Sequence, residues 1–284
     1  MSLSFWIFAP VFLLQIFIIS LYFPAKMIRR LEHVMDTYPP ETYPKLYPRS
    51  KEYYRIFNWA FKWAYRLIFL FGLGLLGAAA YLDTGDVSPV WSAGYGMIQF
   101  IPLLMLDIVG FRLTKEMRRA DTSKLRKAEL RPRRLLSYVS PWLVLAAVLA
   151  FGLSAGMDFV LYEPSEWASR VGWLVFANVF MGVFGAWALY GRKPDPHQSF
   201  ADRSKQIRVQ LTSLMSVSIA ISLFFLFMSL SNRFDMNYLE APAMSCYFLL
   251  INFLSVGQMM RHLRLEDIDF EVYRDDSNGA PAVA

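Results

Sequence analysis

Seven long apolar stretches alternate with polar segments along the chain. Each holds roughly the 20 residues that a helix needs to cross a bilayer. The stretches lie near residues 5–24, 63–82, 91–111, 138–158, 171–190, 209–231 and 241–259. The second is the least clear, because Lys62 and Arg66 interrupt its beginning, although long basic side chains can reach the headgroups from within a span. The pattern predicts an all-α, polytopic integral membrane protein built as a bundle of seven transmembrane helices.

Basic residues are divided very unevenly between the two sides that these spans define. Of the 29 Lys and Arg residues, all but Arg170 and Arg233 fall in four segments that seven spans place on one side: 26–66, 112–134, 192–208 and 261–274. The other side is net acidic, with short loops, and its acidic residues are Asp83, Asp86, Asp158, Glu163, Glu166, Asp235 and Glu240. Because Lys and Arg favour the cytoplasmic side, we expect the N-terminus outside and the C-terminus in the cytoplasm.

Composition agrees with a membrane location. The chain has 56% hydrophobic residues, and a soluble domain of 284 residues could not bury that much apolar surface. The first span is followed at once by Lys26, Arg29 and Arg30 and lacks the flanks of a cleaved signal peptide, so we expect a retained helix. The single cysteine, Cys246, has no partner for an intramolecular disulfide. The compact loops favour a bacterial cytoplasmic (inner) membrane.

We divide the chain into a transmembrane domain, residues 1–264, and an acidic cytoplasmic tail, residues 265–284, which we expect to be partly disordered. Directly after the first span, apolar residues recur between Met27 and Met35 at the spacing of an amphipathic helix that lies on the headgroups or the bundle. Three Tyr-Pro pairs follow in residues 37–48. Since proline pushes the preceding residue toward extended geometry, they predict a stiff, non-helical connector.

The segment 112–134 is the most basic part of the chain. A cluster of this kind at a cytoplasmic surface attracts anionic lipids at about 1 kcal/mol per basic residue. The residues concerned are Arg118, Arg119, Lys124, Arg126, Lys127, Arg131, Arg133 and Arg134. Nucleic acid is disfavoured as a partner because no aromatic or glycine-rich binding motif accompanies the charges, whereas a protein partner or a homo-oligomer remains open. We also hypothesise that the acidic tail docks on this loop.

All three histidines lie just outside predicted spans on the basic side. With Asp195, the residues His33, His197 and His262 would form a mixed imidazole and carboxylate set that suits several divalent metals or acid–base chemistry. No local spacing such as HxxxH supports the set. The alternative is that they are ordinary surface histidines beside the headgroups.

Polar residues inside the spans form a second group of candidates. In the third span Gly96, Gln99, Leu103 and Asp107 share one helical stripe, and an intramembrane acid is a candidate coupling site. Further polar positions are Asn178, Asn252, Ser218, Ser222 and Ser229. Hydrogen bonding between helices is the commoner role of such groups. The glycines Gly72, Gly74 and Gly77, and the pair Gly152 and Gly156, indicate close helix packing.

Several cofactors are excluded by missing residue types. Haem held by histidine within the membrane is excluded because no span contains histidine, and a retinal Schiff base in the seventh span is excluded because that span has no lysine. The GxGxxG at Gly72 lies in an apolar span without a preceding strand, so it is no nucleotide-binding motif. The sequence does not indicate any other particular cofactor.

Two functions of different classes therefore stay open. The first is a non-catalytic binding or assembly component, or a small transporter that uses Asp107, Gln99, Asn178 and Asn252. The second is an enzyme that acts on a lipid or lipid-linked substrate at the cytoplasmic interface through His197, Asp195, His33 and His262, with metal dependence as an option.

Overall fold

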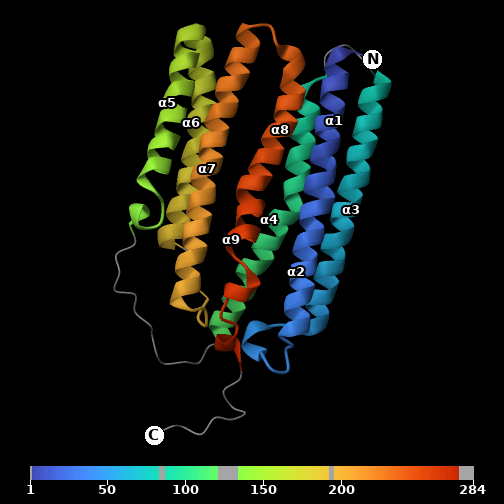
Figure 1. The fold of residues 1–284 in the computed structure, drawn as a ribbon, viewed down its shortest axis with the longest axis vertical. Coiled ribbons are helices and arrows are strands. Elements are labelled where there is room, and N and C mark those ends of the chain that lie inside the picture. Colours follow the sequence, from blue (N-terminus) through green and yellow to red (C-terminus); the bar gives the residue numbers. More distant parts are fainter. Residues whose placement is uncertain (1, 83–86, 121–133, 192–194, 275–284) are drawn as a thin grey trace.

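A computed structural model describes residues 2–82, 87–120, 134–191 and 195–274. These residues form helices and connecting turns without a strand (Figure 1). Seven helices among them are long and apolar enough to cross a membrane, which is compatible with a multi-pass membrane protein. The α-helices are α1 (Leu3–Phe17), α2 (Phe23–Thr37), α3 (Lys51–Leu82), α4 (Pro89–Ala120), α5 (Pro141–Leu161), α6 (Pro164–Ala186), α7 (Phe200–Arg233), α8 (Glu240–Asn252) and α9 (Gln258–His262).

Short helical turns complete this list. The π-helical turn η1 (Ile18–Tyr22) joins α1 to α2, η4 (Trp187–Gly191) extends α6, and η6 (Phe253–Gly257) joins α8 to α9. The first and last spans are therefore continuous helices with a π turn inside each of them. Five 3₁₀ turns are η2 (Pro44–Leu46), η3 (Leu135–Ser137), η5 (Asn237–Leu239), η7 (Leu265–Asp267) and η8 (Glu271–Tyr273).

The helices pack in two groups. One group contains α1–α2, α3, α4 and α8–α9, and the other contains α5, α6 and α7 (Figure 1). Helix α7 also contacts α8 and η6 and so connects the two groups. The N-terminus and the C-terminal end of α5 lie at one end of the bundle. We call the opposite end, where α2 and α9 finish, the basic end (Figure 1).

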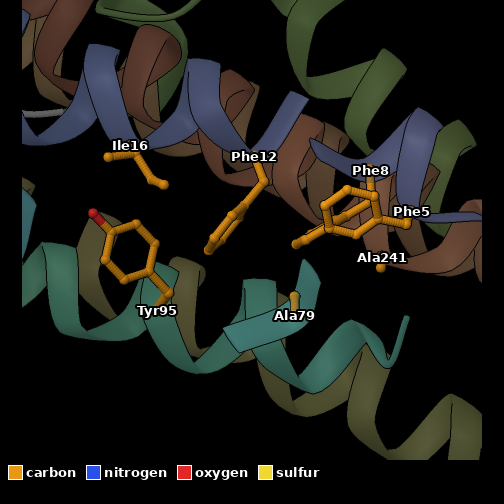
Figure 2. Packing of buried hydrophobic residues seen from close by; sticks show 7 residues of the cluster. All are labelled: Phe5, Phe8, Phe12, Ile16, Ala79, Tyr95 and Ala241. Atoms are coloured by element: carbon orange, nitrogen blue, oxygen red, sulfur yellow. The ribbon is translucent and has the colours of Figure 1, made fainter. Parts of the chain in front are cut away.

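The core of the first group is built on α1. Phe5, Phe8, Phe12 and Ile16 recur every three or four residues and are almost fully buried, so they form one face of the helix (Figure 2). They pack against Ala79, Tyr95 and Ala241 from three other helices. Phe12 lies edge-on to Tyr95 with ring centroids 5.3 Å apart. The first span therefore forms the centre of its group, which agrees with its being the most buried span window.

The amphipathic helix and the mainly non-helical connector expected after the first span are present. Helix α2 continues from η1 and buries Met27 and Ile28, while Lys26, Arg29 and His33 are exposed on its other side. The three tyrosines that precede prolines have φ angles of −121° (Tyr38), −122° (Tyr43) and −118° (Tyr47), outside helical geometry. The connector is non-helical apart from the 3₁₀ turn η2.

Candidate functional site

A groove of about 1030 Å³ lies between α1–α2 and α8–α9. Its walls are formed by apolar side chains of both helices: Leu14, Phe17, Ile18, Tyr22, Phe23, Leu249, Leu250 and Phe253. Phe17 and Phe253, one from each wall, are 53% and 56% exposed, so the groove opens along the outer surface of the bundle. An apolar cavity of this form accepts a long apolar ligand from the side.

The lining is basic where the groove reaches the basic end. Lys26 comes from α2, and Arg261 and His262 come from α9, followed by Arg264. All four side chains are exposed. The lining residues in the described part of the chain include no Asp or Glu. The rim carries an excess of positive charge and favours an anion, although Arg264 also acts on Asp267 outside the groove and helps to lower the pKa of that carboxyl.

Both walls contain a π turn. The turn η1 contributes Ile18 and Tyr22, and η6 contributes Phe253 and Gly257. A π turn adds one residue to a helical turn and is frequent at functional sites. The two walls meet at Gly257, where an added Cβ would lie 3.5 Å from the Phe23 ring. A larger side chain at this glycine would narrow the groove beside Phe23.

The segment after α9 is held against the basic end. The Arg30 guanidinium of α2 donates to the Leu263 carbonyl, which fixes the chain beside the rim. Phe270 stacks on Tyr38 with ring centroids 4.1 Å apart, and the Tyr273 hydroxyl donates to Asp195 at 2.9 Å. The tail thereby joins α2 of one helix group to the start of α7 in the other.

Two acidic residues after α9 also bind polar side chains, one at the start of α7 and one in the connector after α2. Lys205 donates to Asp267 at 2.6 Å and holds the pKa of that carboxyl below its usual range. The Tyr43 hydroxyl donates to Glu271 at 2.9 Å. The hypothesis that the tail docks on the loop 112–134 stays a prediction, since residues 121–133 and 275–284 lie outside the described part.

The candidate metal set is spread over separate places. His33 is exposed on α2 and His262 is exposed at the end of α9, whereas His197 is half-buried beside the Tyr273 ring. Asp195 accepts the His197 backbone N–H at 2.9 Å and the Tyr273 hydroxyl. Within residues 2–82, 87–120, 134–191 and 195–274, no three His, Cys, Asp or Glu side chains converge as metal ligands would. The enzyme hypothesis gains no support from this arrangement.

Of the basic loop residues, the structure describes those at its two ends. Arg119 is exposed and Arg118 is half-buried at the end of α4, and Arg134 is exposed before η3. The other five candidates lie outside the described residues: Lys124, Arg126, Lys127, Arg131 and Arg133.

Gln99 takes part in a fully buried hydrogen-bond network between α1, η1, α3 and α4. Its Nε2 donates to Ser20 at 2.8 Å, and its Oε1 accepts from Gln15 at 3.0 Å. Ser20 in turn hydrogen-bonds the Tyr95 hydroxyl, which donates to the Ile68 carbonyl at 3.1 Å. Every side chain of this network has a partner on another helical segment, so Gln99 has the interhelical role described above.

We expect Gln99→Leu to lower the free energy of unfolding by ~2 kcal/mol, because it leaves the buried Gln15 amide without its partner. The double variant Q15L/Q99L removes both amides and should lose less than half of that amount. Ser20 and Tyr95 keep their mutual bond in both variants. Thermal unfolding in detergent measures the difference. A double variant less stable than Q99L alone would contradict a purely structural role.

The remaining intramembrane candidates differ in their surroundings. Asn178 of α6 donates to the Leu174 carbonyl at 2.9 Å and accepts from Ser218 of α7, whose carbonyl accepts from Ser222 at 3.0 Å. Asn252 of α8 is 1% exposed, and its Oδ1 has no hydrogen-bond partner among the described residues.

Asp107 is exposed on α4, unlike Gly96 and Gln99 of the same predicted stripe, which are buried. The stripe therefore turns from the helix interface to the bundle surface within three turns.

The sequence places Asp158 at the outer end of the fourth predicted span. Asp158 lies within α5, is fully buried, and accepts a hydrogen bond from Ser229 of α7. The apolar run ends near this residue, so hydropathy alone places it at a boundary. A sequence signal did exist, since Ser154 lies four residues earlier and therefore on the same face of the helix.

The chain was compared with protein-family models, curated proteins and solved structures. None of them matches. The groove was missed in the sequence because Lys26 and Arg264 are 238 residues apart, and no local pattern brings them together.

Proposed function

We propose that this chain is a non-catalytic membrane protein that binds an anionic lipid in the groove between α1–α2 and α8–α9. The observation that carries the proposal is the combination of an apolar groove with a basic rim whose described lining residues include no Asp or Glu. A purely apolar ligand would form no ionic contact with the rim, and a small soluble anion would not contact the apolar walls.

The length of the groove supports a lipid. From Leu14 to Lys26 the wall extends over roughly 18 Å of helix at 1.5 Å per residue. That is more than half of the ~30 Å hydrocarbon core of a bilayer. In this arrangement an acyl chain lies along Phe17, Tyr22 and Phe253, while the headgroup reaches the rim.

The rim supports a phosphate-bearing headgroup. Arg261 and Arg264 each present the planar guanidinium that binds phosphate through paired hydrogen bonds, and Lys26 adds a third permanent charge from the opposite wall. The neighbouring pocket of about 320 Å³ is less suited, because Asp202 and Asp267 line it together with basic residues.

The proposal includes an orientation. Seven helices of spanning length and the large apolar side chains exposed on the bundle support insertion in a bilayer. The excess of Lys and Arg at the basic end supports its location on the cytoplasmic side of a bacterial inner membrane, with the N-terminus outside. The rim then lies at the level of the cytoplasmic headgroups.

The test is native mass spectrometry of lipids that remain bound in mild detergent, followed by titration with an anionic and a zwitterionic phospholipid. We expect the wild type to prefer the anionic lipid. The variant R261A/R264A should bind it about 30-fold more weakly, since each basic residue contributes about 1 kcal/mol near a membrane surface.

Two further variants separate the groove from general surface charge. R118A/R119A removes the same charge at the end of α4, outside the groove, and should weaken binding much less than R261A/R264A does. Gly257→Leu keeps the charge, narrows the groove beside Phe23 and should weaken binding. The proposal is wrong if R118A/R119A weakens binding and R261A/R264A does not, or if a soluble phosphate competes with the lipid as well as a second lipid does.

A further inference from the structure

Asp158 is a buried carboxylate with too few hydrogen-bond donors. The Ser229 hydroxyl contacts its Oδ1, but the same hydroxyl lies 3.0 Å from the Phe225 carbonyl. A hydroxyl has one proton and cannot donate to both oxygens at the same time. The other carboxylate oxygen, Oδ2, is buried and has no donor among the described residues.

A second buried oxygen lies one helical turn away. Ser154 is four residues before Asp158 on α5, so both side chains are on the same face of the helix. Ser154 is fully buried, and its Oγ also has no hydrogen-bond partner in the part of the chain that the structure describes. Native proteins rarely leave two such atoms side by side without a ligand or a water.

No basic side chain forms an ion pair with Asp158 among the described residues. The guanidinium of Arg170 of α6 lies over the Tyr162 ring, 4.0 Å from the ring centroid. The Tyr162 hydroxyl donates to the Ser229 carbonyl at 2.9 Å and not to the carboxylate. A buried carboxylate without a counter-charge is strongly unfavourable, so this position requires either a bound cation or a proton.

The geometry points to a binding site for a monovalent metal cation of the size of sodium between α5 and α7. Its ligands are the Asp158 carboxylate and the hydroxyls of Ser154 and Ser229. Carboxylate and hydroxyl oxygens are the ligands that hard cations prefer. One negative charge balances one positive charge, whereas a divalent ion would leave an excess charge in an apolar environment.

A metal ion fits better here than a proton. A protonated Asp158 would donate to Ser229, whose hydroxyl would then donate to the Phe225 carbonyl. That proton still leaves Ser154 Oγ and Asp158 Oδ2 without a partner among the described residues. An ion bridges oxygens that do not touch each other. The site lies near the end of the bundle that holds the N-terminus, away from the basic end (Figure 1).

The experiment is thermal unfolding of the detergent-solubilised chain at constant ionic strength, with sodium chloride exchanged for choline chloride. A ligand that binds only the folded state raises the unfolding midpoint with its concentration. We expect sodium to raise the midpoint of the wild type and choline to have no effect. The apparent sodium affinity should fall about tenfold or more in Asp158→Asn.

Two other variants keep the test conclusive. Ser154→Ala keeps the carboxylate and should weaken the sodium response by several-fold, which covers the case that Asp158→Asn does not fold. Asp107→Asn, an exposed acid on α4, should respond as the wild type does.

Absence of any sodium response in the wild type overturns the proposal. The proposal is also overturned if the unfolding midpoint does not respond to sodium but depends on pH, and if Asp158→Asn removes that pH dependence. Asp158 would then carry a proton. Lipid binding in the groove is independent of either result, since other helices form the groove.

Discussion

Gly72→Ala should destabilise the chain more than any other single methyl group added to a glycine, by ~3 kcal/mol or more. A Cβ at this position of α3 would overlap the hydroxyl and the adjacent ring carbon of Tyr95 and would come within 2.9 Å of Ile16. Tyr95 is 1% exposed, and its hydroxyl is bonded to Ser20 and to the Ile68 carbonyl. The ring therefore has no space to retreat into without breaking these bonds. Overpacking costs ~1–3 kcal/mol, and each lost hydrogen bond adds ~1 kcal/mol.

Gly74→Ala is the matched control for this prediction. Gly74 lies on the same helix, and an added Cβ there meets nothing within 4 Å. Alanine is the better helix former, so this variant should be neutral or more stable by up to ~1 kcal/mol. Thermal unfolding of both variants in the same detergent decides the matter. Equal stabilities would mean that α3 and α4 do not pack as closely as we describe.

The glycines show how far the sequence predicts packing. Gly72, Gly74, Gly77, Gly152 and Gly156 were all interpreted as sites of close helix contact. That is wrong for Gly74, Gly77, Gly152 and Gly156, because an added Cβ at each of these four meets no atom of the described residues within 4 Å. A small residue in an apolar span faces a neighbouring helix or the surface, and its spacing alone does not distinguish the two.

The seven helices of spanning length were predictable for a simple physical reason. Each span needs about 20 apolar residues, and the segments between them carry the charges. The helix ends were less predictable. Helix α3 begins at Lys51 and α7 at Phe200, about ten residues before the predicted spans, because a helix does not end where its sequence becomes polar.

The sequence predicts single polar residues of a candidate site, but not the contacts that bring distant parts of the chain together. Gln99 could be recognised as a buried polar residue of a span, but its partners Gln15 and Ser20 depend on how α1 packs against α4. The π turn η1, which contains Ser20, has no signature in the sequence. The groove likewise depends on the pairing of the first and last spans, which hydropathy does not specify.

Gly96→Ala should cost ~2–3 kcal/mol, because it forces apart the contact between α4 and α8. An added Cβ would lie 2.5 Å from Cγ and Cδ2 and 2.6 Å from Cδ1 of Phe248. Cγ is the first atom of the ring, so rotation of the ring about its own axis does not relieve the overlap. The whole side chain has to change its rotamer, and it then meets Phe100 and Tyr247, which lie beside it. Gly94→Ala, with nothing within 4 Å, is the control on the same helix.

A second substitution tests the cause directly. Phe248→Ala removes the ring and leaves room for the methyl group at position 96. The double variant G96A/F248A should therefore be more stable than the sum of the two single effects predicts, with a coupling of ~1–3 kcal/mol. Strict additivity would show that the loss in Gly96→Ala arises elsewhere. The contact matters beyond stability, because α8 continues through η6 into one wall of the groove. Gly96→Ala should therefore shift α8 and weaken lipid binding. Gly94→Ala should cause no shift and leave lipid binding unchanged.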